Sequence, residues 1–133
     1  MSPVRKRKRI LILEDDDDVS ELLAMALEEA GYEPIVHRDA AEVDPGLTSA
    51  PSVIILDMVM PQARMDGFAF LIGLAGQRAA MGIPLIILSG LADVMERALD
   101  AAMAQHLTIA GVFPKPFSID DVLAKVNELT RAA

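Results

Sequence analysis

The stretch Val53-Ile54-Ile55-Leu56-Asp57 decides the fold class of this chain, because four apolar residues in a row run directly into a carboxylate. A short, continuous, mostly β-branched run is typical of a strand that is covered on both faces, as in a parallel sheet. Residues 10–13 (ILIL) and 85–88 (LIIL) have the same character. We therefore predict three central strands, with weaker strands at residues 34–37 and 111–113 nearer the edges of the sheet.

Helical patterns lie between these strands. After the first strand, apolar residues recur at the spacing of one helix face, and these are Val19, Leu22, Leu23, Ala26, Leu27 and Ala30. Asp18 and Glu21 resemble a capping box at the start of this helix, and Gly31 is a natural stop.

The last segment repeats the helical spacing with Ile119, Val122, Leu123, Val126 and Leu129. Ser118 is its expected N-cap, with Asp121 as the third residue of the helix. Residues 67–80 and 92–106 are rich in Ala, Leu and Met, so we predict helices there as well. Residues 40–49 are the hardest to interpret, because Pro45 and Gly46 would cut a helix short.

Five strands that alternate with five helices predict an α/β fold, a doubly wound five-stranded parallel sheet with helices on both faces. The 133 residues, of which 53% are hydrophobic, suffice for one domain, expected over residues 10–131. The chain has no cysteine, which excludes disulfides and thiolate metal sites. The sequence contains neither an apolar run that could cross a bilayer nor a signal peptide, so we expect a cytoplasmic protein without membrane contact.

Residues 5–9 (RKRKR) form a basic run in a chain whose formal net charge is −8. Such a run can bind nucleic acid or anionic lipid. However, the sequence that follows has neither a helix-turn-helix nor a basic recognition helix. We therefore interpret residues 1–9 as a solvated leader and expect no direct binding of nucleic acid.

Polar side chains stand where the predicted strands end: Glu14 and Asp15 after the first, then Asp57, Ser89 and Lys115. In a doubly wound sheet, ligands bind at the carboxyl ends of the strands. Carboxylates gathered there repel one another unless a cation joins them, and oxygen-only ligands favour Mg²⁺ or Mn²⁺. A carboxylate beside Mg²⁺ can act as a nucleophile toward phosphorus, with an ammonium and a hydroxyl orienting the phosphoryl oxygens. Each residue alone has an ordinary structural explanation, but the combination favours phosphoryl chemistry.

These motifs, in this order, resemble the receiver domain of two-component response regulators over residues 10–129. The matching segments are Glu14-Asp15, Leu56-Asp57-Met58-Val59-Met60-Pro61, Asp66-Gly67, Leu88-Ser89-Gly90 and Lys115-Pro116-Phe117. The resemblance implies a flavodoxin-like sheet with strand order 2-1-3-4-5.

The resemblance also implies the roles of the site residues. Asp57 would be the phosphoacceptor, and Asp15 would bind Mg²⁺ directly while Glu14 acts through water. The backbone carbonyl of Val59 would complete the metal ligands that the protein supplies. Ser89 would donate its hydroxyl to the phosphoryl group, and Lys115 would pair with that group from a position before a cis peptide bond.

A receiver domain is a signalling phosphoacceptor and not an enzyme, although it assists its own phosphorylation and dephosphorylation. Its donor would be a histidine kinase or a phosphotransfer protein. Phosphorylation would change the face formed by residues 92–106, the strand at 111–113 and the last helix, with Gly90 as a flexible joint. An effector protein or a second copy of the chain would bind this face. His106 is expected to interact with the end of its helix rather than to relay phosphate.

Three features depart from the family pattern. The loop from Pro61 to Gly67 has two more residues than the usual Pro-x-Met-Asp-Gly and brings a cation, Arg64, near the site. Val112 stands where an aromatic residue is common, and the adjacent Phe113 should point to the opposite face. Val59 and Leu91 are apolar at positions that tune phosphate lifetime, so we expect a long-lived phosphoryl group.

Two other functions stay open. A haloacid-dehalogenase-type phosphatase also uses an aspartate nucleophile, but it needs a second acid where this chain has Val59. A receiver-like interaction module that works without phosphorylation is the other alternative, and Mg²⁺-dependent stabilisation that is lost in Asp15→Ala would argue against it. The sequence identifies neither the kinase, the output pathway nor the oligomeric state, and it leaves open whether the domain stands alone or belongs to a longer protein.

Overall fold

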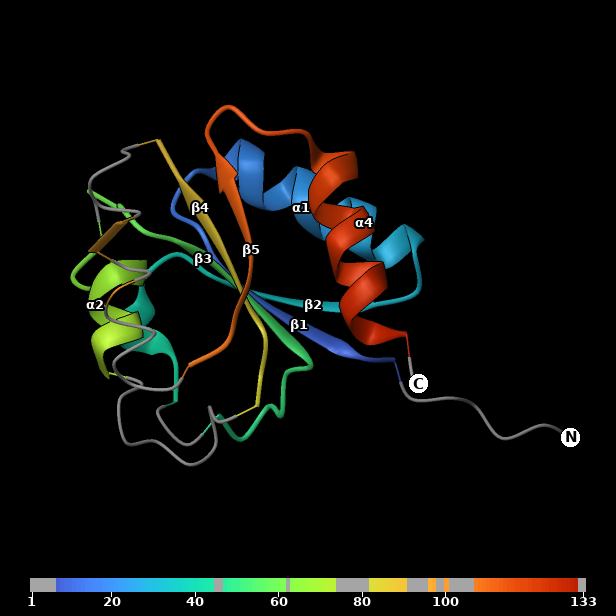
Figure 1. The fold of residues 1–133 in the computed structure, drawn as a ribbon, viewed down its shortest axis with the longest axis horizontal. Coiled ribbons are helices and arrows are strands. Elements are labelled where there is room, and N and C mark those ends of the chain that lie inside the picture. Colours follow the sequence, from blue (N-terminus) through green and yellow to red (C-terminus); the bar gives the residue numbers. More distant parts are fainter. Residues whose placement is uncertain are drawn as a thin grey trace, which may run out of the picture.

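A computed structural model describes residues 7–44, 47–61, 63–73, 82–90, 96, 97, 100 and 107–131. Its five strands form one parallel sheet in the order β2-β1-β3-β4-β5 (Figure 1). Their bounds are β1 Arg9–Leu13, β2 Glu33–His37, β3 Val53–Asp57, β4 Leu85–Ser89 and β5 Ile109–Pro114. The predicted fold class and strand order are confirmed, and the two weaker strands are the edge strands.

Helices cover both faces of this sheet. Helices α1 (Asp17–Glu29) and α4 (Ile119–Thr130) lie on one face, and α2 (Gly67–Gly73) with the short 3₁₀ helix η1 (Ala40–Glu42) lies on the other (Figure 1). Each face has its own hydrophobic cluster, because successive residues of β1, β3 and β4 point to opposite sides. Every residue of β3 and β4 is buried, as a doubly covered parallel sheet requires.

The strand register brings the functional ends of the strands to one edge. Leu13 pairs with Leu56, so β1 and β3 end side by side. Asp57 pairs with Leu88, one residue before the end of β4. Residues that follow directly after these strands therefore meet at the carboxyl edge of the sheet, where the sequence predicts the site.

Helix α1 begins differently from the sequence prediction. Its N-cap is Asp16, whose carboxylate accepts a hydrogen bond of 3.1 Å from the backbone N–H of Val19. The predicted capping box of Asp18 with Glu21 is therefore wrong. The predicted apolar face is also too wide, because Leu22 is 54% exposed while Leu23 is buried.

Helix α4 agrees with the sequence prediction. Ser118 is its N-cap and accepts a hydrogen bond of 3.4 Å from the backbone N–H of Asp121. Val122 and Val126 are fully buried against the sheet. The region at residues 40–49 was the hardest to interpret. Among its described residues, only 40–42 form a helix, the 3₁₀ helix η1. Residues 45, 46 and 74–80, and most of the predicted helix at 92–106 with His106, lie outside the described residues.

At the amino ends of the strands, opposite the carboxyl edge, side-chain hydrogen bonds connect the two ends of the described chain. The ammonium of Lys8 donates a hydrogen bond to the backbone carbonyl of Thr130 in the last turn of α4. The hydroxyl of Tyr32 lies 2.6 Å from both the side-chain oxygen of Asn127 and the hydroxyl of Thr130. Arg7 and Arg131 line one pocket of about 370 Å³ with these residues. Among the described helices, none has the length and apolar character needed to cross a membrane.

Candidate functional site

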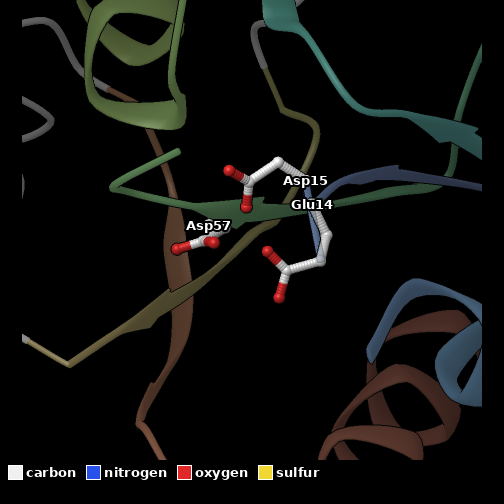
Figure 2. Close-up of side chains that lie close together, drawn as sticks. All are labelled: Glu14, Asp15 and Asp57. Atoms are coloured by element: carbon white, nitrogen blue, oxygen red, sulfur yellow. The ribbon is translucent and has the colours of Figure 1, made fainter. Parts of the chain in front are cut away.

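Three carboxylates converge at the carboxyl edge of the sheet. Glu14 and Asp15 follow β1 directly, and Asp57 is the last residue of β3. One oxygen atom from each lies within 4.8 Å of the others, and Figure 2 shows the three side chains pointing toward one another. Glu14 and Asp57 are buried while Asp15 is half-buried, so the cluster is open to solvent on the Asp15 side.

Lys115 supplies the cation that joins this cluster. Its Nζ lies 3.0 Å from Oε1 of Glu14 and 2.9 Å from Oδ2 of Asp57. The backbone N–H of Lys115 also donates a hydrogen bond of 2.9 Å to the carbonyl of Ser89, which aligns the end of β5 with the end of β4. The peptide bond between Lys115 and Pro116 is cis, as the sequence resemblance predicts.

Burial gives Glu14 unusual acid–base behaviour. The pKa of its carboxyl group is raised to about 8, chiefly because burial removes it from water and also because Asp57 is close by, while Lys115 opposes both effects. Burial alone would lower the pKa of Lys115, but its hydrogen bonds to Asp57 and Glu14 outweigh this, so the pKa is raised. Lys115 therefore remains protonated at neutral pH, and the cluster has one cation for several acids.

The cluster fits a divalent metal ion. Oε2 of Glu14 is buried and has no hydrogen-bond partner among the described residues, which is costly unless another group binds there. All the candidate ligands are carboxylate oxygens, the donors that hard cations such as Mg²⁺ prefer. A cation at this point would satisfy that orphaned oxygen and reduce the repulsion between the acids.

The segment after β3 is fixed close to Asp57. The backbone N–H of Val59 donates a hydrogen bond of 3.3 Å to Oδ1 of Asp57, and Met58 and Met60 are buried. Gly67, the first residue of α2, lies against the peptide group of Asp57: a Cβ atom there would lie 2.0 Å from that carbonyl oxygen. A residue with a side chain would therefore push α2 away from the end of β3.

Comparison with known protein families decides the assignment. The family model described as the response regulator receiver domain matches residues 10–127. The chain belongs to this family. This membership favours a receiver domain over the haloacid-dehalogenase-type phosphatase that the sequence alone leaves open.

Curated relatives of this receiver domain are longer proteins. It is 31% identical over 129 residues to the DNA-binding dual master transcriptional regulator RpaA of Synechocystis sp., covering 92% of this chain and 49% of that protein. It is 32% identical over 126 residues to the response regulator MprA of Mycobacterium tuberculosis, covering 92% and 50%. The chain thus spans about half the length of these relatives.

Solved structures of receiver domains have the same fold. The receiver domain of the Francisella response regulator 1452 superposes with a TM-score of 0.74 at 28% sequence identity, covering 92% of this chain and 96% of that one. The sheet order β2-β1-β3-β4-β5 and the helices on both faces are therefore those of an ordinary receiver domain.

The structure places the remaining predicted residues of this receiver domain as follows. Ser89 is the last residue of β4 and is 2% exposed, at the same edge as the carboxylates. Phe113 packs against the cluster beneath α1 and α4, whereas Val112 pairs with Ile87, which belongs to the other cluster. The prediction that Phe113 points to the face opposite Val112 is confirmed. Leu91 lies outside the described residues.

Arg64 does not contact the carboxylate cluster directly. Its Nε lies 3.2 Å from Oδ2 of Asp39, and its backbone N–H donates a hydrogen bond of 2.9 Å to the same oxygen. Asp39, which follows β2, is the polar residue near the site that sequence reasoning missed. Its position before Ala40 suggests an N-cap, which it is for η1, but nothing in the local sequence indicates its contact with the inserted loop.

Proposed function

We propose that this receiver domain accepts a phosphoryl group on Asp57 from a histidine kinase or a phosphotransfer protein. A carboxylate oxygen of Asp57 attacks the phosphorus of a phosphohistidine, the phosphorus–nitrogen bond breaks with its electrons on the imidazole nitrogen, and an acyl phosphate forms. The observation that carries this proposal is the contact of one ammonium, Lys115, with both Glu14 and Asp57 beside the half-buried Asp15.

Each site residue has a distinct role in this proposal. Lys115 exchanges its contact with the carboxylates for one with a phosphoryl oxygen, and Ser89 donates its hydroxyl to another. Glu14, Asp15, Asp57 and the backbone carbonyl of Val59 would hold Mg²⁺ or Mn²⁺, with Glu14 acting through water. When bound, this ion neutralises charge on the phosphoryl oxygens and on the attacking carboxylate.

The site also indicates where the donor protein binds. A pocket of about 470 Å³ adjoins Lys115 and is lined mainly by apolar side chains, namely Val19, Leu22, Pro116, Phe117 and Ile119, with Asp16 at its rim. A phosphohistidine must approach Asp57 from this edge of the sheet, because the strands and helices bury the other sides. We infer that the donor packs against this pocket and covers the exposed Leu22.

The phosphorylated state acts as a signal through a changed surface. We propose that this surface comprises β5, α4 and the predicted helix at residues 92–106, and that it binds an effector protein or a second copy of the chain. The charge added at Asp57 attracts Ser89, the last residue of β4, and Lys115, which directly follows β5. Their movement shifts the equilibrium between two conformations.

The proposal extends to the chain as a whole. Residues 10–131 would form the receiver domain and residues 1–9 a basic leader, whose last residue, Arg9, already belongs to β1. The protein would act in the cytoplasm as a phosphoacceptor rather than as an enzyme with a separate substrate.

Intact-mass spectrometry after incubation with acetyl phosphate and Mg²⁺ tests the proposed function. We expect the wild type to gain the mass of one phosphoryl group and Asp57→Ala to gain none. The control is Asp120→Ala, which removes an exposed acid from the first turn of α4 and leaves the carboxylate cluster intact. If the wild type stays unlabelled and binds no Mg²⁺, the domain works without phosphorylation. Equal labelling of Asp57→Ala would place the phosphoacceptor elsewhere.

A further inference from the structure

Asp39 accepts hydrogen bonds from two segments that are distant in the sequence. Its Oδ1 accepts from the backbone N–H of Ala41 at 2.9 Å and from that of Met65 at 3.1 Å. Its Oδ2 accepts from the backbone N–H of Arg64 at 2.9 Å and from Nε of the same residue at 3.2 Å. One carboxylate thus joins the turn after β2 to the loop after β3.

The contact between these segments is reciprocal. The backbone N–H of Ala40 donates a hydrogen bond of 2.9 Å to the carbonyl of Met65. The side chain of Asp39 is 14% exposed, whereas that of Arg64 is 79% exposed. The carboxylate is therefore shielded by its donors while most of the arginine side chain faces solvent. Hydrogen bonds to a shielded carboxylate are stronger than those of an exposed ion pair.

The clamped loop leads directly to the phosphoacceptor. Met65 is followed by Asp66, whose side chain accepts a hydrogen bond of 3.0 Å from the backbone N–H of Ala69 and so starts α2. The next residue, Gly67, lies against the carbonyl of Asp57. Because only Asp66 separates Met65 from Gly67, the position of Met65 determines how α2 packs on the end of β3.

Asp39 also lies near the acidic site itself. It lines a pocket of about 330 Å³ together with Asp15, Asp17, Arg38, Glu42 and Ala63. The donated hydrogen bonds, that of the Arg64 backbone first, lower the pKa of Asp39 to about 2. The carboxylate therefore stays ionised, and its hydrogen bonds stay in place, over the whole pH range of a phosphorylation assay.

We propose that Asp39 is a positioning residue for phosphorylation, because its carboxylate holds the loop at residues 63–65 in the place that aligns Asp57 and Val59. This inference rests on the proposed function. It also assigns a purpose to the lengthened loop, whose backbone N–H groups at Arg64 and Met65 make the contact. The arginine side chain adds one further hydrogen bond and is secondary to the backbone.

The test measures two properties of the folded protein: the affinity for Mg²⁺ by calorimetry and the initial rate of labelling by acetyl phosphate. Asp39→Ala removes all four hydrogen bonds. Asp39→Asn can keep the two hydrogen bonds that Oδ1 accepts from the backbone of Ala41 and Met65. However, it places an NH₂ group against the backbone N–H and the Nε–H of Arg64. The matched control is Asp44→Ala. It removes a carboxylate from the same connection, where Asp44 accepts hydrogen bonds from the backbone N–H of Thr48 at 3.3 Å and from the hydroxyl of Thr48 at 2.6 Å.

We expect Asp39→Ala to weaken Mg²⁺ binding and slow labelling by about tenfold, as for residues that orient metal ligands. Asp39→Asn should lie between Asp39→Ala and the wild type, and Asp44→Ala should match the wild type. Circular dichroism at the assay temperature verifies that each variant is folded. The inference is wrong if folded Asp39→Ala and Asp39→Asn keep wild-type affinity and rate, or if Asp44→Ala loses as much. If the wild type itself is not labelled, the proposed function fails, and this inference fails with it.

Discussion

The buried carboxyl group of Glu14 couples the electrostatics of the site to the stability of the whole domain. One of its oxygens accepts a hydrogen bond from Lys115, which also contacts Asp57, and the other has no partner among the described residues. Without a metal ion, the fold favours its protonated form, whose pKa rises from 4.5 to about 8. Its proton therefore links the stability of the domain to pH and to the binding of cations.

This linkage predicts a stability that falls with rising pH when no divalent ion is present. The contribution of Glu14 is complete below pH 4.5, where it is protonated in both states, and is lost as the pH rises toward 8. We expect thermal unfolding in EDTA to show a loss on the order of a few kcal/mol across that window. Glu14→Gln should flatten the profile, and an unchanged slope in this variant would contradict the raised pKa.

Among the helices, the start of α1 depends on one residue of a run of four aspartates, residues 15–18. Asp16 caps the helix by accepting from Val19, while Asp17 and Asp18 lie in its first turn. An N-cap contributes about 1 kcal/mol, whereas an acid in the first turn contributes a few tenths through the helix dipole. The position within the helix, and not the residue type, therefore decides how much each aspartate matters.

Urea unfolding followed by circular dichroism can test this assignment. We expect Asp16→Ala to lower the free energy of unfolding by about 1 kcal/mol. Asp18→Ala serves as the matched control and should lower it by less than half as much. A larger loss for Asp18→Ala would restore the capping box that the sequence suggests.

The three central strands could be predicted from the sequence almost to the residue, whereas the last strand is longer than the predicted residues 111–113. Their apolar runs are buried on both faces, so β1, β3 and β4 leave a signal that does not depend on neighbouring segments. The exposure of Leu22 and the identity of the N-cap of α1 could not be predicted. An apolar spacing shows which face is buried but not how wide the contact is. The four aspartates at residues 15–18 are equally suitable caps by residue type.

The candidate site was also predictable in part. Asp57 and Ser89 are the last residues of their strands, and Glu14, Asp15 and Lys115 directly follow theirs. Parallel strands bring such residues to one edge of the sheet. The role of Asp39 was not predictable, because it contacts a loop 25 residues away through backbone groups that leave no pattern in the sequence.

At the scale of the whole molecule, a bound cation adds to the stability of the fold. A ligand that binds only the folded state stabilises it in proportion to the logarithm of its concentration, by about 2.7 kcal/mol at one hundred times its dissociation constant. Since the carboxylates come from β1 and β3, this stabilisation acts on the centre of the sheet.

We therefore expect saturating Mg²⁺ to raise the melting temperature of the wild type by roughly 10 °C. Asp15→Ala should lose most of this increase. Asp120→Ala, which removes an exposed acid from the first turn of α4, should keep it. Calorimetric scans with NaCl at matched ionic strength separate specific binding from screening. An equal increase in all three proteins would mean that the ion binds elsewhere.

The hydrogen bond from Lys8 to the carbonyl of Thr130 has a consequence for the connectivity of the fold. It brings both ends of the described chain to one side of the sheet, where Arg7 and Arg131 line the same pocket. Sequence fused at either end would therefore emerge away from Asp57 and leave the access of a donor unobstructed. Because these ends lie close together, a short linker could join them. We expect a chain that is joined here and opened in an exposed loop to fold with the same spatial order of strands.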